Sequence, residues 1–144
     1  MSKIKKLGMG IVAFDDVTHL KNICSEIRDL VDVIVVCLQN ESYFGNPIER
    51  AVVEHIELLK SEGVVDDIIW FSGVDYGNSI EAPRLTETDK RNYILDRLEK
   101  HHGCSHSFIT DSDEFYSHDE FKEAKSIVDS HDAVSSYCQY VNYY

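Results

Sequence analysis

Val33-Ile34-Val35-Val36-Cys37-Leu38 is an uninterrupted apolar run with the length of a β-strand. Similar apolar runs recur at residues 7–14, 67–71, 107–110 and 133–143. Stretches with helical periodicity separate these runs, and this alternation is typical of a mainly parallel sheet with helices on both faces. We therefore predict a Rossmann-like α/β fold with five strands and four helices, which forms one domain over residues 1–144.

Start signals and apolar spacing predict the first two helices. Asp15 or Asp16 would cap the first, whose apolar side chains recur every three or four residues up to Leu30. Asn46 would cap the second, with a proline in its first turn, and Gly63 would end it. Each of these helices presents one apolar stripe to the predicted sheet.

The other two predicted helices begin at capping-box patterns. Thr86 with Asp89 starts the third, and Ser117 with Glu120 starts the fourth. The side chains that we expect to face the core in these two helices are Ile94, Leu95, Leu98, Phe121, Ala124 and Val128.

The composition is that of a folded but strongly acidic protein. Hydrophobic residues make up 43% of the chain, charged residues 28%, and the formal net charge is −12. Binding to a nucleic-acid backbone requires clustered Lys and Arg, so this charge argues against a nucleic-acid partner. A phosphorylated small molecule can still bind if a cation or a few local basic groups neutralise its charge.

The apolar residues and the cysteines indicate where in the cell the protein is expected to be. No stretch reaches the roughly 18 uninterrupted apolar residues that a membrane span requires, so we predict a cytoplasmic protein without a transmembrane segment. The widely spaced cysteines are expected to be reduced, and most lie in predicted helices or strands where a small apolar side chain fits. They are Cys24, Cys37, Cys104 and Cys138.

Polar and acidic residues follow three of the predicted strands. These segments are Phe14-Asp15-Asp16, Gln39-Asn40-Glu41 and Asp111-Ser112-Asp113-Glu114. In open parallel sheets, ligands bind beyond the carboxyl ends of the strands. We therefore expect the candidate site at this edge of the sheet.

The pair Asp111 and Asp113 is the strongest candidate for chemistry. Two carboxylates separated by one residue repel each other unless a cation lies beside them, and oxygen ligands suit Mg²⁺ or Mn²⁺. Such a cation could bridge to a diphosphate. Taken alone, the motif is better interpreted as a strand end or a helix cap, but Lys90-Arg91-Asn92 lies on the preceding helix and could contact the same phosphates.

The order of these motifs resembles that of glycosyltransferases of the GT-A fold, particularly family 2. Those proteins have a first strand ending near an aromatic residue, a helix with a basic residue followed by Asn, and a hydrophobic strand ending in Asp-x-Asp. This chain has Val12-Ala13-Phe14, then Arg91-Asn92, then residues 108–115 with Asp111-Ser112-Asp113. The resemblance covers nearly the whole chain, as the nucleotide-sugar-binding N-terminal half of such an enzyme.

The resemblance implies a set of site residues and a function. Asp111 and Asp113 would hold Mn²⁺ or Mg²⁺, and Asp111 could instead contact the ribose. The nucleotide-sugar-binding set is Ala13, Phe14, Asp15, Gln39, Arg91, Asp111 and Ser112. The implied function is transfer of a sugar from a nucleoside-diphosphate sugar to an unknown acceptor.

The chain departs from the family pattern in two ways. Family members commonly have an acidic residue and a Gly-rich turn after the second strand, where this chain has residues 39–42, Gln-Asn-Glu-Ser. The family's acceptor half normally follows the point where this chain stops, at Tyr144, so we assign no catalytic base. A non-catalytic nucleotide-binding module is therefore an alternative, and homo-oligomer formation is left open.

Other classes fit less well. A phosphatase of the haloacid dehalogenase type also has Asp-x-Asp after a strand, but its motif usually opens the domain. A receiver-like module would require a phosphoacceptor aspartate at the end of the third strand, where this chain has Ser72-Gly73.

The histidine-rich residues 101–106 suggest zinc, but a helix end with polar caps is the favoured interpretation. The aromatic tail could stack on a sugar or form an edge strand: Tyr137, Tyr140, Tyr143 and Tyr144.

Overall fold

The computed structural model describes residues 3–73 and 75–131. The strands are β1 (Leu7–Val12), β2 (Val33–Gln39), β3 (Asp67–Phe71) and β4 (His106–Asp111). The helices are α1 (Leu20–Ile27), α2 (Arg50–Ser61), α3 (Ala82–Asp96) and α4 (His118–Ser130). A 3₁₀ turn, η1 (Arg28–Leu30), follows α1, and a π-helical turn, η2 (Arg97–His101), continues α3. The predicted fifth strand and the aromatic tail lie outside the described residues.

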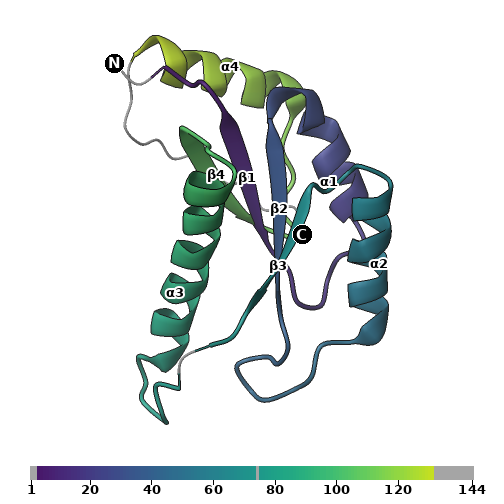
Figure 1. The fold of residues 1–144 in the computed structure, drawn as a ribbon, viewed down its shortest axis with the longest axis vertical. Helices are drawn as coiled ribbons and strands as arrows, with labels where there is room; N and C mark the ends of the chain where they lie inside the picture. Colours follow the sequence, from purple (N-terminus) through teal and green to yellow (C-terminus); the bar gives the residue numbers. More distant parts are fainter. Residues whose placement is uncertain (1–2, 74, 132–144) are drawn as a thin grey trace.

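The described strands form one parallel sheet in the order β3-β2-β1-β4. The chain builds outward from β1 to β3 and then crosses to the other side of β1 to add β4, as Figure 1 shows. The point where strand order reverses, between β1 and β4, is where doubly wound sheets commonly bind ligands. The predicted Rossmann-like α/β fold is confirmed.

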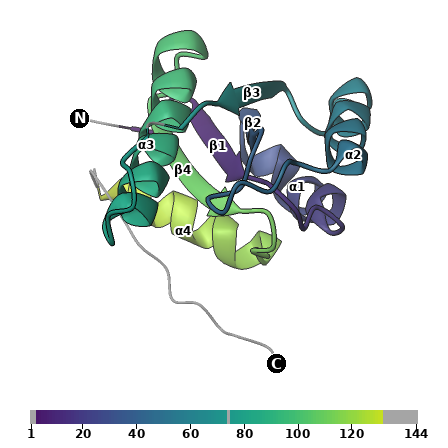
Figure 2. The same ribbon diagram turned by 90° about the horizontal axis from the view of Figure 1, so that it is seen from below.

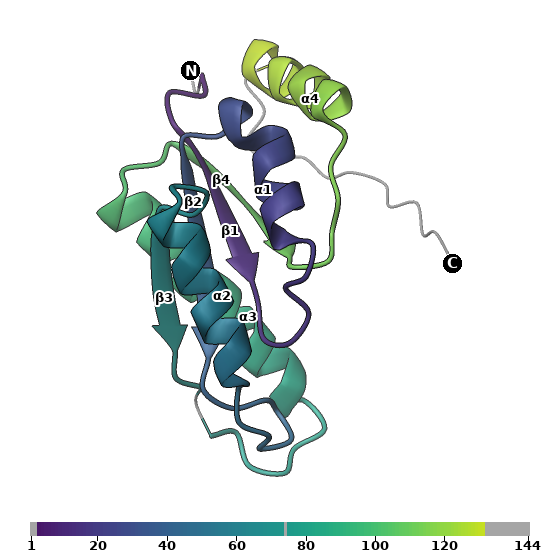
Figure 3. The same ribbon diagram turned by 90° about the vertical axis from the view of Figure 1, so that its right-hand side faces the viewer.

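Helices cover both faces of this sheet. Seen from below, α3 lies on one side of the strands, while α1 and α4 lie on the other (Figure 2). Figure 3 shows α2 on the same side as α1, with α4 beyond the end of α1. Among the described helices, none combines the length and apolar character needed to cross a membrane.

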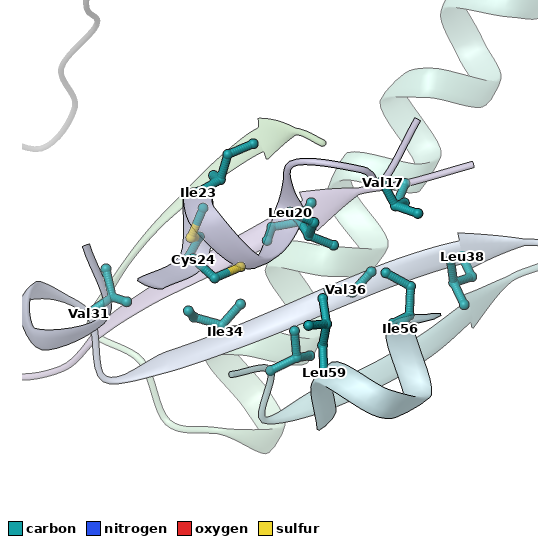
Figure 4. Close-up of a cluster of buried hydrophobic side chains, with 14 of the residues drawn as sticks. Val17, Leu20, Ile23, Cys24, Val31, Ile34, Val36, Leu38, Ile56 and Leu59 are labelled. Carbon is teal, nitrogen blue, oxygen red and sulfur yellow. The ribbon is translucent and has the colours of Figure 1, made fainter. Parts of the chain in front are cut away.

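The alternating side chains of the strands divide the core into two layers. The layer under α1 and α2 joins alternate side chains of β1 and β2 to the inner stripes of both helices (Figure 4). The buried stripe of α1 is Leu20, Ile23, Cys24 and Ile27, as the spacing predicts. The layer under α3 contains Val35 and Cys37 of β2, Ile69 of β3, and Ile94 and Leu98.

Glycines on β1 allow α3 to approach the sheet closely. Gly8 and Gly10 occupy two of the β1 positions that face α3 and η2. A Cβ atom at Gly8 would lie 2.7 Å from Cys104 Sγ, and one at Gly10 would overlap Ile94 Cγ2. The helix that carries Arg91 therefore rests almost directly on the β1 backbone.

The structure corrects the predicted helix starts. Helix α2 begins at Arg50, because Pro47 instead forms an isolated bridge with Glu41 in the preceding loop. Helix α3 begins at Ala82, a full turn before Thr86, with a proline in its first turn. Ser117 does precede α4, but its side chain makes no capping hydrogen bond.

Two predicted core side chains are also exposed. Leu95 is 37% exposed on α3, and Ala124 is exposed on α4. Helix α4 has no fully buried side chain and packs mainly through Phe121, whose ring lies 5.2 Å from that of Phe108. Polar contacts therefore carry much of the attachment of α4.

One of these polar contacts predicts a pH-dependent stability. His118 Nε2 lies 3.0 Å from Asp29 Oδ1, and this hydrogen bond raises the pKa of His118 above its ordinary 6.5. The same hydrogen bond lowers the pKa of Asp29 below its ordinary 3.8. Because the folded state binds the His118 proton more tightly, its stabilising contribution is complete below about pH 6.5 and declines as pH rises through the raised pKa.

We expect His118→Gln to lower the free energy of unfolding at pH 6 and to have a smaller effect at pH 8.5. Urea unfolding at both pH values measures this difference. The matched control is His131→Gln at the end of the same helix, where the imidazole contacts only Ser130 and Ile127 among the described residues. A His118→Gln effect that is equal at both pH values would contradict the assignment.

Candidate nucleotide and metal site

The strand register brings three predicted segments to one row at the carboxyl edge. Val12 pairs with Cys37 on one side and with Asp111 on the other. Beyond this row, Ala13 N donates to Cys37 O at 3.1 Å, and Ser112 N donates to Val12 O at 3.1 Å. Ala13 thus lies between the ends of β2 and β4.

Ala13 and Ser112 offer a ligand little side-chain surface. Ala13 is 2% exposed and Ser112 is 9% exposed. Phe14 is half-buried, whereas Asp15 is exposed and its Oδ1 accepts a hydrogen bond from Asp16 N at 2.8 Å. Among the described residues, no hydrogen bond or ion pair joins Asp15 to the row at Asp111.

Arg91 and Asp111 are in direct contact. Arg91 Nη2 donates to Asp111 Oδ1 at 3.1 Å, and Arg91 Nε donates to Glu87 Oε1 at 2.8 Å. Glu87 and Arg91 are four residues apart, so they share a face of α3. Asp111 pairs with Val12, whose side chain packs in the layer under α3. The basic residue predicted from the helix therefore meets the acidic strand end.

Negative charge is in excess around this contact. Burial raises the pKa of Asp111 above its ordinary value of 3.8; Arg91 opposes this, while Glu114, Glu87 and Asp113 add to it. Lys90 Nζ also lies 3.4 Å from Glu87 Oε2, so Arg91 and Lys90 face the four carboxylates of Glu87, Asp111, Asp113 and Glu114. A cation beside Asp111 would remove the repulsion, and carboxylate oxygens are the ligands that Mg²⁺ and Mn²⁺ prefer.

Glu114 has a structural role that its sequence position only partly suggests. Its Oε2 accepts hydrogen bonds from Thr110 Oγ1 at 2.6 Å and from Asp111 N at 3.0 Å. The side chain therefore folds back on the end of β4 and closes the turn that carries Asp113. Asp113 itself is exposed, and it stands beyond the row with its carboxylate available to an ion.

A groove of about 920 Å³ opens at the ends of β2 and β3, and its lining reaches Thr86 on α3, the residue before Glu87. Gln39 lines it, as do the aromatic side chains of Tyr43, Phe44, Phe71 and Tyr76. Tyr43 and Phe44 form an edge-to-face pair with ring centroids 5.3 Å apart. Aromatic faces and an amide are the groups that commonly hold a planar heterocycle.

Sequence reasoning missed Tyr43 and Tyr76 as groove residues. Tyr76 lies in the long loop before α3, and its hydroxyl donates to Asp89 of α3. The length and Gly content of this loop were the available signals. Of the predicted nucleotide-binding residues, only Gln39 lines the groove, whereas Arg91 and Asp111 contact each other outside its lining.

We compared the chain with models of protein families, with curated proteins and with solved structures, and none of these comparisons finds a match. The geometry of the site is therefore the basis on which its function is proposed.

Proposed function

We propose that this chain binds a nucleoside-diphosphate sugar through Mn²⁺ or Mg²⁺ and acts as a metal-dependent glycosyltransferase of the GT-A type. The observation that carries the proposal is the excess of carboxylates around Asp111, whose pKa lies above its ordinary value despite the contact with Arg91. The groove at the ends of β2 and β3 supports it, because its lining reaches Thr86, the residue before Glu87. We propose that a base in this groove and a diphosphate at Asp111 belong to one ligand.

Different residues would contact different parts of the ligand. Asp111 and Asp113 would hold the cation, which when bound supplies positive charge to the diphosphate leaving group. Gln39 would hydrogen-bond the base within the groove. Ala13 lies between the ends of β2 and β4, so we propose that its backbone lies against the ligand between the base and the diphosphate.

Arg91 is placed to add a second positive charge. Its Nε and one Nη2 donor are used by Glu87 and Asp111. A guanidinium has five N–H donors, so the Nη1 donors remain for a phosphate oxygen. We propose that Arg91 contacts the diphosphate while keeping its contact with Asp111.

One observation favours a second candidate, a module that binds the nucleotide sugar without transferring it. An inverting transfer needs a base that deprotonates the acceptor hydroxyl. Within the described residues, Glu87 is held by Arg91, and Glu114 is held by Thr110 and the Asp111 backbone. Neither carboxylate is free to act as that base in this state.

We also propose that the protein acts in the cytoplasm. The described cysteines, Cys24, Cys37 and Cys104, are buried and unpaired, as expected for a reducing compartment. Burial raises the pKa of the Cys24 and Cys37 thiols to about 12, so both remain protonated and unreactive.

Calorimetry against a panel of nucleoside diphosphates tests the proposed ligand. With Mn²⁺ present, we expect one member of the panel to bind with a stoichiometry of one, and we expect removal of the metal to weaken binding at least about tenfold. Binding that is unchanged by a chelator, or a panel without any binder, would refute the proposal. Assay of sugar release with the selected nucleotide sugar then separates transferase from binding module.

A further inference from the structure

A second group of metal-ligand side chains lies at the opposite edge of the sheet. Asp67 is the first residue of β3, His101 is the last residue of η2, and His102 follows it. Strand β3 begins at the edge remote from the nucleotide groove, and α3 runs back along the sheet so that its end reaches the same edge. The group is thus separate from Asp111 and Asp113.

The three side chains converge closely. One ligand atom from each of Asp67, His101 and His102 can be chosen so that all lie within 4.8 Å of one another. His102 Nε2 is 2.9 Å from Asp67 Oδ2. Tetrahedral zinc with N and O ligands at 2.0–2.2 Å needs ligand atoms roughly 3.4 Å apart, so small side-chain rotations produce that spacing.

The backbone at the end of α3 fixes His102 in this position. The π-helical turn is closed by His102 N, which donates to Arg97 O at 3.2 Å, and Gly103 with φ 67° ends the helix. Such π-turns within helices are frequent at functional sites. The turn brings two consecutive histidines to the start of β3.

The group is buried on its inner side and open to water on its outer side. The Asp67 side chain is 12% exposed and that of His102 is 20% exposed, whereas His101 is exposed at the rim. The His101 and His102 rings meet edge to face, with centroids 4.8 Å apart. An ion would therefore have two anchored ligands, one adjustable ligand and a side open to water.

Two basic side chains already contact Asp67 and must be accommodated. Arg97 Nε donates to Asp67 Oδ2 at 2.8 Å, and Lys60 Nζ lies 4.0 Å from Oδ1. A carboxylate offers about four lone-pair sites, so Arg97 can stay as a supporting hydrogen bond while an ion binds. Lys60 is 48% exposed and can turn into water.

We propose that Asp67, His101 and His102 form a binding site for zinc or a similar divalent transition metal, with water completing the coordination. Two imidazole nitrogens and one carboxylate oxygen are typical of zinc, cobalt and nickel sites and unlike the all-oxygen sites of Mg²⁺. The ion would join the end of α3 to the start of β3. This site does not depend on the proposed nucleotide function.

Calorimetric titration of the full chain with ZnCl₂ at pH 7.5 tests the site. We expect one tight site in the wild type, weakened at least tenfold by His101→Ala and by His102→Ala. His106→Ala is the matched control, because this histidine belongs to the same segment but contacts Ser105 instead, and we expect a change below twofold. Circular dichroism without metal reports whether each variant folds.

The results of these titrations distinguish a zinc site from a network of ion pairs. His101 is exposed, so His101→Ala keeps the proposal testable if His102→Ala fails to fold. Asp113→Ala should retain zinc binding, which distinguishes this site from the proposed Mn²⁺ site. Absence of a tight zinc site, or equal weakening by His101→Ala and His106→Ala, would overturn the assignment and leave a network of ion pairs at this edge.

Discussion

Replacing Asp113 by alanine is expected to abolish metal-dependent nucleotide binding while the fold is retained. Asp113 is exposed just beyond β4, and it adds to the negative charge that raises the pKa of Asp111. Loss of one carboxylate ligand leaves the cation with a single aspartate. We expect the affinity measured with Mn²⁺ to fall at least about tenfold, to the level seen with a chelator.

The control must remove the same charge elsewhere. Glu123→Ala does so on α4, where the Glu123 side chain is exposed. We expect this variant to bind as the wild type does, and both variants to unfold at the same urea concentration as the wild type. Unchanged nucleotide affinity in Asp113→Ala would show that the motif only ends a strand.

The sheet could be predicted because its strands are visible in the sequence as apolar runs. Val33–Gln39 is buried along almost its whole length, as an apolar run covered on both faces requires. The alternation with helical stripes then predicts parallel strands, and parallel strands place their carboxyl ends together. The sequence alone therefore predicts that the ends of β1, β2 and β4 lie in one row.

Helix starts were less predictable because capping patterns are local and their side chains have other partners. Asp89, predicted to complete a capping box with Thr86, instead accepts a hydrogen bond from Tyr76 in the loop before α3. Pro47 pairs with Glu41 rather than opening α2. In both places a contact across a loop outweighs the local signal.

The contact between Arg91 and Asp111 illustrates what sequence order can reveal about a site. A basic residue on a helix leading into an acidic strand end was expected near it, and the structure joins the two. The histidine-rich residues 101–106 suggested zinc, but the sequence did not reveal a further ligand, because Asp67 is 35 residues from His102 and only the fold brings them together. For that reason polar caps were the favoured interpretation of the histidines.

Replacing Gly10 by alanine is expected to destabilise the fold. The added Cβ would overlap Ile94 Cγ2, and Ile94 is completely buried under α3, so the helix must shift or the side chain must leave its rotamer. Overpacking of this kind costs about 1–3 kcal/mol, and it outweighs the 0.5–1 kcal/mol that alanine normally gains over glycine in a strand. Urea unfolding measures the net loss.

Two further variants distinguish this collision from a general effect of removing glycine. Gly73→Ala is the control, because its Cβ would meet no neighbour closer than 3.8 Å, and we expect no loss of stability. Ile94→Ala alone should cost about 2–5 kcal/mol through the cavity it leaves. Combined with Gly10→Ala, it should cost less than the sum, by about 0.5–3 kcal/mol, because the new methyl group occupies that cavity. Additive losses would show that the two residues do not compete for space.

The same substitution links packing to the proposed site. Ile94 and Arg91 are three residues apart on α3, so displacement of the helix from β1 also moves Arg91 away from Asp111 on β4. Gly10→Ala should therefore weaken Mn²⁺-dependent nucleotide binding in the fraction of protein that remains folded, although Gly10 touches no ligand. The Ile94→Ala change that relieves the overlap should restore part of that binding. A less-than-additive loss of stability without any recovery of affinity would mean that the approach of α3 to β1 positions the core and not Arg91.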